Sequence, residues 1–131
     1  MTDDTVEEIK RRKLEAMQSG DTPPAPEAPV DVEGEAHFQE LIESHPVVLV
    51  DYHAEWCGPC HQLKPIVERI AAETSAVVAA VDIDHHRELA MGAGVRSVPT
   101  LALYANGEQV ERLVGVQPFE RLQGLIDAHA A

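Results

Sequence analysis

The sequence predicts an α/β protein with a mixed central β-sheet flanked by helices, and three observations lead to this fold class. First, an apolar run from Val47 to His53 is followed by a helical pattern and by a second apolar run from Val77 to Ile83. Second, the pair Asn106-Gly107, a strong hairpin signal, separates two later strand-like segments. Third, a helical pattern from Pro118 to Ala128 closes the chain. A βαβ half followed by a ββα half gives a sheet with parallel and antiparallel neighbours.

The first half of the predicted domain contains two strands and two helices. Val30 to Val32 is expected to be a short edge strand, and Val47 to His53 is apolar enough to be a central strand. The helix predicted from Glu35 to Ser44 carries its apolar residues at helical spacing: Phe38, Leu41 and Ile42. The helix predicted from Cys57 to Glu73 contains Pro65, which should kink it by removing a backbone donor. One face of that helix is apolar: Leu63, Ile66, Val67 and Ile70.

The second half supplies the remaining strands and helices. Val77 to Ile83 is expected to be a strand, followed by a short helix from His86 to Ala93. The hairpin strands are predicted to run from Thr100 to Ala105 and from Gln109 to Val114. The closing helix should direct four apolar side chains inward: Phe119, Leu122, Leu125 and Ile126.

The first 29 residues are predicted to form a separate segment. Thr5-Val6-Glu7-Glu8 resembles a capping box, so a short helix is expected from Val6 to Gln18. The stretch from residue 22 to residue 29 is rich in proline, which is typical of an extended linker. We therefore expect a mobile tail over residues 1–29 and one folded domain over residues 30–131.

The composition limits the possible partners. The chain has 131 residues and a formal net charge of −13, from 23 acidic and 10 basic side chains. This charge argues against nucleic acid as a partner, because phosphate binding needs a basic face. The N-terminus lacks the apolar stretch of a secretory signal, and no segment is long enough for a membrane span. We expect a soluble, cytoplasmic monomer without nucleic acid or membrane partners.

The negative charge has two possible explanations. The chain contains only three lysines, which are Lys10, Lys13 and Lys64. An acidic, lysine-poor surface is typical of halophilic proteins, since concentrated salt screens the repulsion between like charges. The alternative is an ordinary acidic protein with a pI near 4.8. We favour the halophilic interpretation.

Both cysteines lie in the segment Trp56-Cys57-Gly58-Pro59-Cys60, at a predicted strand-to-helix junction. An intramolecular disulfide must join these two, and so short a loop restrains an unfolded chain very little. The pair therefore indicates a redox centre rather than a structural crosslink. Two inert thiols, or half of a metal site completed by His53 and His61, are the alternatives. We expect no metal and no cofactor, since zinc normally needs four protein ligands at a structural site.

Several separate motifs together resemble the thioredoxin family. They cover the predicted domain from Val30 to Ala131: Val50-Asp51-Tyr52, Ala54-Glu55-Trp56-Cys57-Gly58-Pro59-Cys60, Pro65, Asp82-Ile83-Asp84, Val95-Arg96-Ser97-Val98-Pro99-Thr100, Asn106-Gly107-Glu108 and Val114-Gly115. The Gly-Pro dipeptide resembles that of the reducing members. The resemblance implies a thioredoxin fold and a protein-disulfide reductase that carries electrons. Its partners would be disulfide-containing proteins and a thioredoxin reductase that recharges it.

Three residues are the candidate catalytic groups. Cys57 begins a helix, where unpaired N–H groups and the helix dipole favour its thiolate as the attacking group. Cys60, one turn further, is expected to be more buried and to resolve the mixed disulfide. Asp51 lies in a run of valine and leucine, so burial should raise its pKa and let it accept the Cys60 proton. The alternative for Asp51 is a strand-edge acid that faces solvent.

The remaining candidate residues concern substrate binding. By resemblance, the Val98–Pro99 bond should be cis and should face the cysteines, although a trans bond is commoner at X-Pro positions in general. An apolar rim for protein substrates would surround Cys57: Trp56, Gly58, Pro59, Val98, Pro99 and Gly115. Trp56 could instead be a core residue. His85-His86 is interpreted as a solvated turn, since the side chains of adjacent residues diverge.

The chain departs from the family pattern at three positions. Ala80 stands where relatives often have a lysine near the buried acid, His53 where tryptophan is common, and His61 where lysine is common. These departures affect the expected reduction potential and pKa values rather than the chemistry of disulfide exchange. A disulfide oxidase or isomerase is one alternative function, and a non-enzymatic interaction module with vestigial thiols is another. The Gly-Pro dipeptide argues against the first, and the intact set of candidate residues argues against the second.

Overall fold

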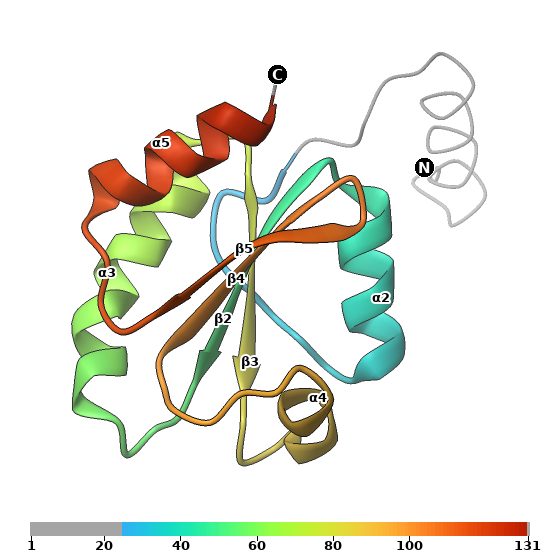
Figure 1. Cartoon of the computed structure of the whole chain (residues 1–131), viewed down its shortest axis with the longest axis vertical. Coiled ribbons are helices and arrows are strands. Elements are labelled where there is room, and N and C mark those ends of the chain that lie inside the picture. The colour runs from blue at the N-terminus through green and yellow to red at the C-terminus, as the bar shows by residue number, and fades with distance from the viewer. Residues whose placement is uncertain (1–24, 131) are drawn as a thin grey trace, which may run out of the picture.

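The computed structural model describes residues 25–130, which fold around a five-stranded mixed sheet (Figure 1). The strand order is β1-β3-β2-β4-β5. The strands are β1 (Val30–Asp31), β2 (Val47–His53), β3 (Val77–Asp82), β4 (Thr100–Ala105) and β5 (Glu108–Val114). β2 is parallel to β3 and antiparallel to β4, so it lies in the centre of the sheet as its apolar sequence predicts.

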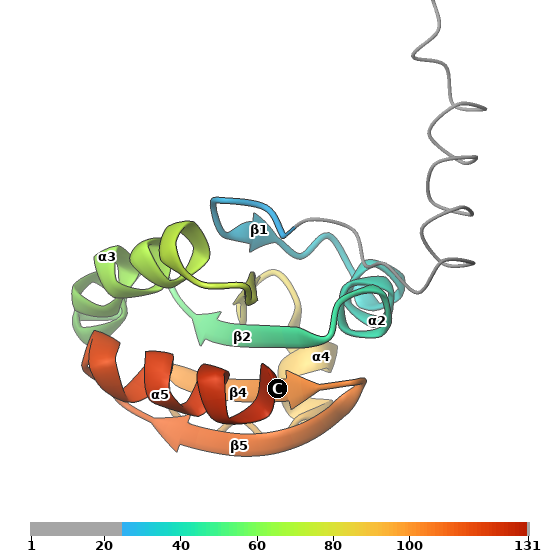
Figure 2. The ribbon, with the colours of Figure 1, turned by 90° about the horizontal axis from the view of Figure 1, so that it is seen from above.

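Helices cover both faces of the sheet, as the view from above shows (Figure 2). They are α2 (Glu35–Ser44), α3 (Gly58–Glu73), α4 (Arg87–Gly92) and α5 (Phe119–Ala130). One core cluster joins α3 and α5 to the sheet, with Leu63, Ile70, Leu122 and Ile126 among its fully buried side chains. The other joins α2 to the opposite face through Phe38, Leu41 and Ile42. The predicted class, a mixed sheet between helices, is confirmed.

Successive residues of β2 belong to opposite cores. Val47 and Leu49 pack in the cluster under α3, whereas Val48, Val50 and Tyr52 pack in the cluster under α2. Because side chains alternate along a strand, Asp51 shares the face of Val47 and Leu49 and points toward α3. This alternation places a carboxylate beneath the helix that carries Cys60.

All the elements predicted for the domain are present: α2, β2 and β4 have the expected bounds, and the others differ by one or two residues at an end. Cys57 is the N-cap of α3 rather than its first residue, and β1 is one residue shorter than expected. α3 continues through Pro65. Ile66 and Leu125 are half-buried at the edge of the core, because they lie at the margin of the apolar face of their helices. The hairpin turn has positive φ at Asn106 (53°) and Gly107 (85°), the backbone that this residue pair favours.

The expected tail lies almost entirely outside the described residues. The predicted helix from Val6 to Gln18 and the start of the proline-rich stretch belong to residues 1–24. Within the described part, Ala25 packs against the α2 core cluster. Ala28 and Pro29 line a cavity on the α3 side of the sheet. The division into a tail over residues 1–29 and a domain over residues 30–131 stays a prediction.

Candidate active site

The two cysteines lie where the loop after β2 enters α3. They form a disulfide, with their Cα atoms 5.2 Å apart. Cys57 caps the helix, and its Sγ accepts a hydrogen bond from the backbone N–H of Cys60 at 3.2 Å. Pro59 occupies the first turn of the helix, where a missing N–H costs nothing. The local sequence thus places one sulfur at the positive end of the helix dipole.

The expected difference in burial between the cysteines is not observed. Both residues are buried, but Cys60 is 7% exposed and Cys57 is 4% exposed. The expectation that Cys60 is the more buried of the two is therefore wrong. Both cysteines pack in one cluster with Ala54, and Cys60 but not Cys57 lines a cavity under the start of α3.

The loop before β4 lies against the disulfide. The Val98–Pro99 peptide bond is cis, as the resemblance implies. The carbonyl oxygen of Val98 is 3.5 Å from Cys57 Sγ. Pro99 is buried, and its carbonyl accepts a hydrogen bond from the N–H of Gly115 at 2.9 Å. The loop of Val98 therefore contacts Cys57, and Gly115 is joined to that loop rather than to the cysteine.

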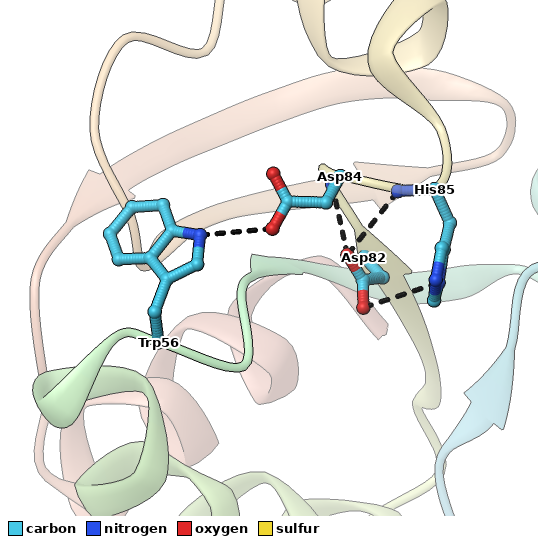
Figure 3. A network of polar contacts seen from close by, with 4 residues as sticks. All are labelled: Trp56, Asp82, Asp84 and His85. Carbon is cyan, nitrogen blue, oxygen red and sulfur yellow. Dashed lines mark hydrogen bonds and ion pairs between the residues drawn. The ribbon is translucent and has the colours of Figure 1, made fainter.

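Trp56 stands at the edge of this site and is not a core residue. Its side chain is on the surface, since 68% of the residue is exposed. Gly58 and Pro59 are exposed beside it, and Val98 and Gly115 are half-buried. The indole Nε1 of Trp56 donates a hydrogen bond of 2.9 Å to Asp84 Oδ2 (Figure 3). The sequence pattern assigns no role to Asp84, because a contact across 28 positions leaves no local signal.

Asp51 is buried rather than exposed at a strand edge. It is 6% exposed, and its Oδ1 makes no hydrogen bond within the described residues. Burial raises the pKa of Asp51 from its ordinary value of 3.8 to about 7. On the neighbouring strand β3, the residue in register with Asp51 is Ala80, so β3 offers no amine at this position.

A single cavity connects Asp51 to Cys60. Its volume is about 640 Å³, and Asp51, His53, Cys60, Lys64 and Ala80 are among the residues that line it. A carboxylate and a cysteine that share a solvent-accessible space can exchange a proton directly or through water. Asp51 and Cys60 therefore face the same cavity.

The histidines near the site lie on two different elements, α3 and the turn after β3. His61 is exposed, and its Nε2 lies 2.7 Å from the carbonyl oxygen of Glu55. His85 and His86 lie in the turn after β3, where His85 is exposed and His86 half-buried, so the predicted solvated turn is confirmed. Within residues 25–130, no group of three or more histidine, cysteine, aspartate or glutamate side chains is arranged to hold a metal ion.

Comparisons with known proteins agree with this geometry. The family model described as Thioredoxin matches residues 29–128. The chain belongs to the thioredoxin family. Thioredoxin from Chlamydia caviae is 45% identical over 102 residues, which are 77% of this chain and 99% of that protein. Thioredoxin 1 from Synechococcus elongatus is 40% identical over 93 residues, covering 70% of this chain and 87% of that protein.

A solved structure has the same fold. A point mutant of thioredoxin from Halobacterium salinarum NRC-1 superposes with a TM-score of 0.80 at 43% identity. The match covers 83% of this chain and 96% of that one. The fold is therefore the thioredoxin fold, and the chain is a thiol–disulfide oxidoreductase that reduces protein disulfides. In the described part of the chain, no helix is long and apolar enough to span a membrane.

Proposed function

We propose that this thioredoxin-family protein reduces disulfides of other proteins through a dithiol formed by Cys57 and Cys60. The Cys57 thiolate attacks one substrate sulfur, which forms a mixed disulfide and releases the other substrate sulfur as a thiolate. Cys60 then attacks Cys57 Sγ, which closes the Cys57–Cys60 disulfide and releases the substrate's second thiolate. Two electrons pass from the dithiol to the substrate. The observation that carries this proposal is the Cys57–Cys60 pair at the start of α3.

Cys57 is the attacking sulfur in this scheme because of what surrounds it. Its Sγ already accepts the N–H of Cys60 at 3.2 Å, and this donor can stabilise a thiolate in the reduced protein. The dipole of α3, a helix of 16 residues, adds a favourable potential at the same point. Helix position, rather than depth of burial, therefore distinguishes the two cysteines.

Asp51 is the proposed base for the resolving step. Its pKa of about 7 leaves it partly protonated and partly ionised at neutral pH, so it can both accept and return a proton. Cys60 loses its proton as it attacks, and the carboxylate in the shared cavity receives it. The proton then leaves through the cavity to solvent, and the released substrate thiolates take up protons from solvent. The oxidised Cys57–Cys60 pair must receive two electrons from an external reductant before the next turnover.

The rim around Cys57 is the proposed docking surface for protein substrates. It consists of Trp56, Gly58, Pro59, Val98, Pro99 and Gly115. An extended substrate segment would lie beside the backbone of Val98, whose carbonyl is 3.5 Å from Cys57 Sγ. A thioredoxin reductase would return electrons at the same rim. We further propose that the protein works as a cytoplasmic monomer.

Reduction of insulin by the purified protein tests the proposal. The dithiol form should reduce insulin disulfides stoichiometrically without added metal or cofactor, and catalytically in the presence of dithiothreitol. Equilibration with defined glutathione mixtures separates a reductase from an oxidase, because the reduction potential should be about −270 mV for a reductase and about −120 mV for a strong oxidase. Failure to reduce insulin, with a correctly formed Cys57–Cys60 disulfide, would contradict the function.

We also propose that the protein is adapted to high salt. Its 23 acidic side chains against 10 basic ones repel one another in dilute buffer. The similarity to a thioredoxin from Halobacterium salinarum supports the same interpretation. In 1 M salt the Debye length falls to about 3 Å, so most of this repulsion is screened.

We predict that the melting temperature rises steadily from dilute buffer to molar KCl. A flat or falling dependence would leave an ordinary acidic protein as the explanation.

Removal of the N-terminal segment tests the proposed division of the chain. We predict that a protein lacking residues 1–24 reduces insulin at a rate within a few-fold of the full chain, because none of the proposed site residues lies in this segment. A second protein lacking residues 1–29 also removes the contacts of Ala25, Ala28 and Pro29, and it should be less stable. A large increase in rate on the shorter truncation would show instead that the segment restricts access to Cys57.

A further inference from the structure

One carboxylate, that of Asp82 at the end of β3, orders the turn that follows the strand (Figure 3). Asp82 Oδ1 accepts hydrogen bonds from the backbone N–H of Asp84 at 2.9 Å and of His85 at 3.4 Å. The backbone carbonyl of Asp82 accepts from the N–H of His85 at 3.2 Å and of His86 at 2.9 Å. Two hydrogen bonds of the turn therefore end on the Asp82 carboxylate and two on its backbone carbonyl, while the N–H of Ile83 donates to the carbonyl of His53 at 2.9 Å.

The same turn supplies a polar partner for the rim tryptophan. Asp84 Oδ2 accepts the indole N–H of Trp56 at 2.9 Å. Because Trp56 is 68% exposed, packing alone fixes the orientation of its ring only weakly. The indole can keep its orientation only if Asp84 keeps its place, and the place of Asp84 is set by the turn.

We propose that Asp82 is a positioning residue for protein substrates: by ordering the turn it holds Asp84, and through Asp84 it holds Trp56 in the orientation that a docking polypeptide meets. This inference rests on the proposed role of the rim in docking. Asp82 also lines the cavity of Asp51 and Cys60. In this proposal it acts on docking and not on the exchange of disulfides, so its effect should appear with large substrates and be absent with small ones.

The acceptor function of Asp82, rather than its negative charge, carries this role. An aspartate oxygen that bonds to an N–H two residues further on mimics a backbone turn. The Asp82 side chain is only 18% exposed, so it is held in place to accept these bonds, whereas the two donor residues are exposed and the N–H of His85 also reaches the Asp82 carbonyl. The acceptor therefore fixes the geometry of the Asp84 N–H more than it compensates a buried donor. The ion pair with His85 is different, since the histidine side chain is 77% exposed and the distance from its Nδ1 to Asp82 Oδ2 is 3.4 Å. Such an exposed pair contributes little.

Three variants separate these functions. Asp82→Ala removes the acceptor, Asp82→Asn keeps an acceptor oxygen without the charge, and His85→Ala removes the ion pair as a matched control. We expect Asp82→Ala to raise KM for insulin by up to about fivefold with little change in kcat, because the loss of one hydrogen bond of ordinary net strength is the most that the turn can transmit to docking. Asp82→Asn and His85→Ala should stay within about twofold of the original protein. Reduction of a small aromatic disulfide should be unchanged in all three, because it does not need the rim.

The indole itself reports the same effect. Trp56 is the only tryptophan of the chain, so tryptophan fluorescence, excited selectively over that of the two tyrosines, comes from one site. In the oxidised protein, Asp82→Ala and Asp84→Ala should both increase quenching of Trp56 by acrylamide, whereas His85→Ala should not. If Asp82 acts through Asp84, the double variant should match Asp84→Ala alone rather than add the two effects.

Several outcomes would overturn the inference. They are an unchanged KM and unchanged quenching in Asp82→Ala, additive effects in the double variant, or an equal loss with the small disulfide. If Asp82→Ala does not fold, Asp82→Glu replaces it, since the longer side chain keeps the charge but moves the acceptor away from the Asp84 N–H. A parent protein that reduces neither insulin nor the small disulfide would contradict the proposed function. If the parent protein reduces both substrates and Asp82→Ala reduces both equally well, only this inference is contradicted.

Discussion

Replacing Cys57 by serine is expected to reduce the rate of insulin reduction to the uncatalysed background. The serine hydroxyl does not ionise near neutral pH and forms no disulfide, so the first attack on the substrate cannot occur. Cys60→Ser should give a different result, because Cys57 can still attack while the resolving thiol is missing. Mixed disulfides between Cys57 and substrate proteins should then accumulate and appear on non-reducing gels.

The pair of variants provides its own control. Both lose one thiol and the disulfide, so a general effect on folding would affect them alike, and melting curves of the reduced proteins check this. Only the proposed order of attack predicts trapping by Cys60→Ser and none by Cys57→Ser. The opposite pattern would assign the attack to Cys60, the cysteine that faces the cavity and is slightly more exposed.

The strands and helices could be predicted from local patterns because each pattern has one dominant cause. The run from Val47 to His53 is apolar on both faces, which only a central strand between two helical layers satisfies. Asn106-Gly107 specifies its own turn through positive φ at both residues. The predicted and observed bounds differ at the ends of elements, because capping interactions decide where a helix begins and ends. Cys57 caps α3 from outside the helix, and periodicity cannot reveal that.

The site was predictable only in part from the sequence. The spacing of Cys57 and Cys60 indicates redox chemistry directly, and the apolar surroundings of Asp51 predict its raised pKa. The prediction that Cys60 is the more buried cysteine was wrong, because a cavity forms from side chains of several elements and no local pattern encodes it. The contact between Trp56 and Asp84 is also missing from the sequence prediction, since it depends on how β3 ends relative to α3.

Asp51→Asn should stabilise the oxidised protein above neutral pH, and the pH dependence gives the sign. Below about pH 3, Asp51 is protonated in both the folded and the unfolded chain, so its ionisation has no effect on stability. Between about pH 3 and 7 the unfolded chain releases this proton while the folded protein retains it, since burial raises the pKa from 3.8 to about 7. The free energy of unfolding therefore decreases across this range, and the whole loss, about 4 kcal/mol, is present above pH 7.

The variant removes that loss because asparagine does not ionise. We expect chemical denaturation to give nearly equal stabilities for the two proteins at pH 4 and a gain of about 2 to 4 kcal/mol for Asp51→Asn at pH 8. Asp127→Asn, on the exposed face of α5, is the control for the loss of one negative charge and should change little at either pH.

The same Asp51→Asn protein should resolve mixed disulfides more slowly near pH 7, and its rate should lose the dependence on pH centred there. Equal stabilities at pH 8 would show that Asp51 ionises without cost in the folded protein. An unchanged pH–rate profile would show that another group receives the Cys60 proton.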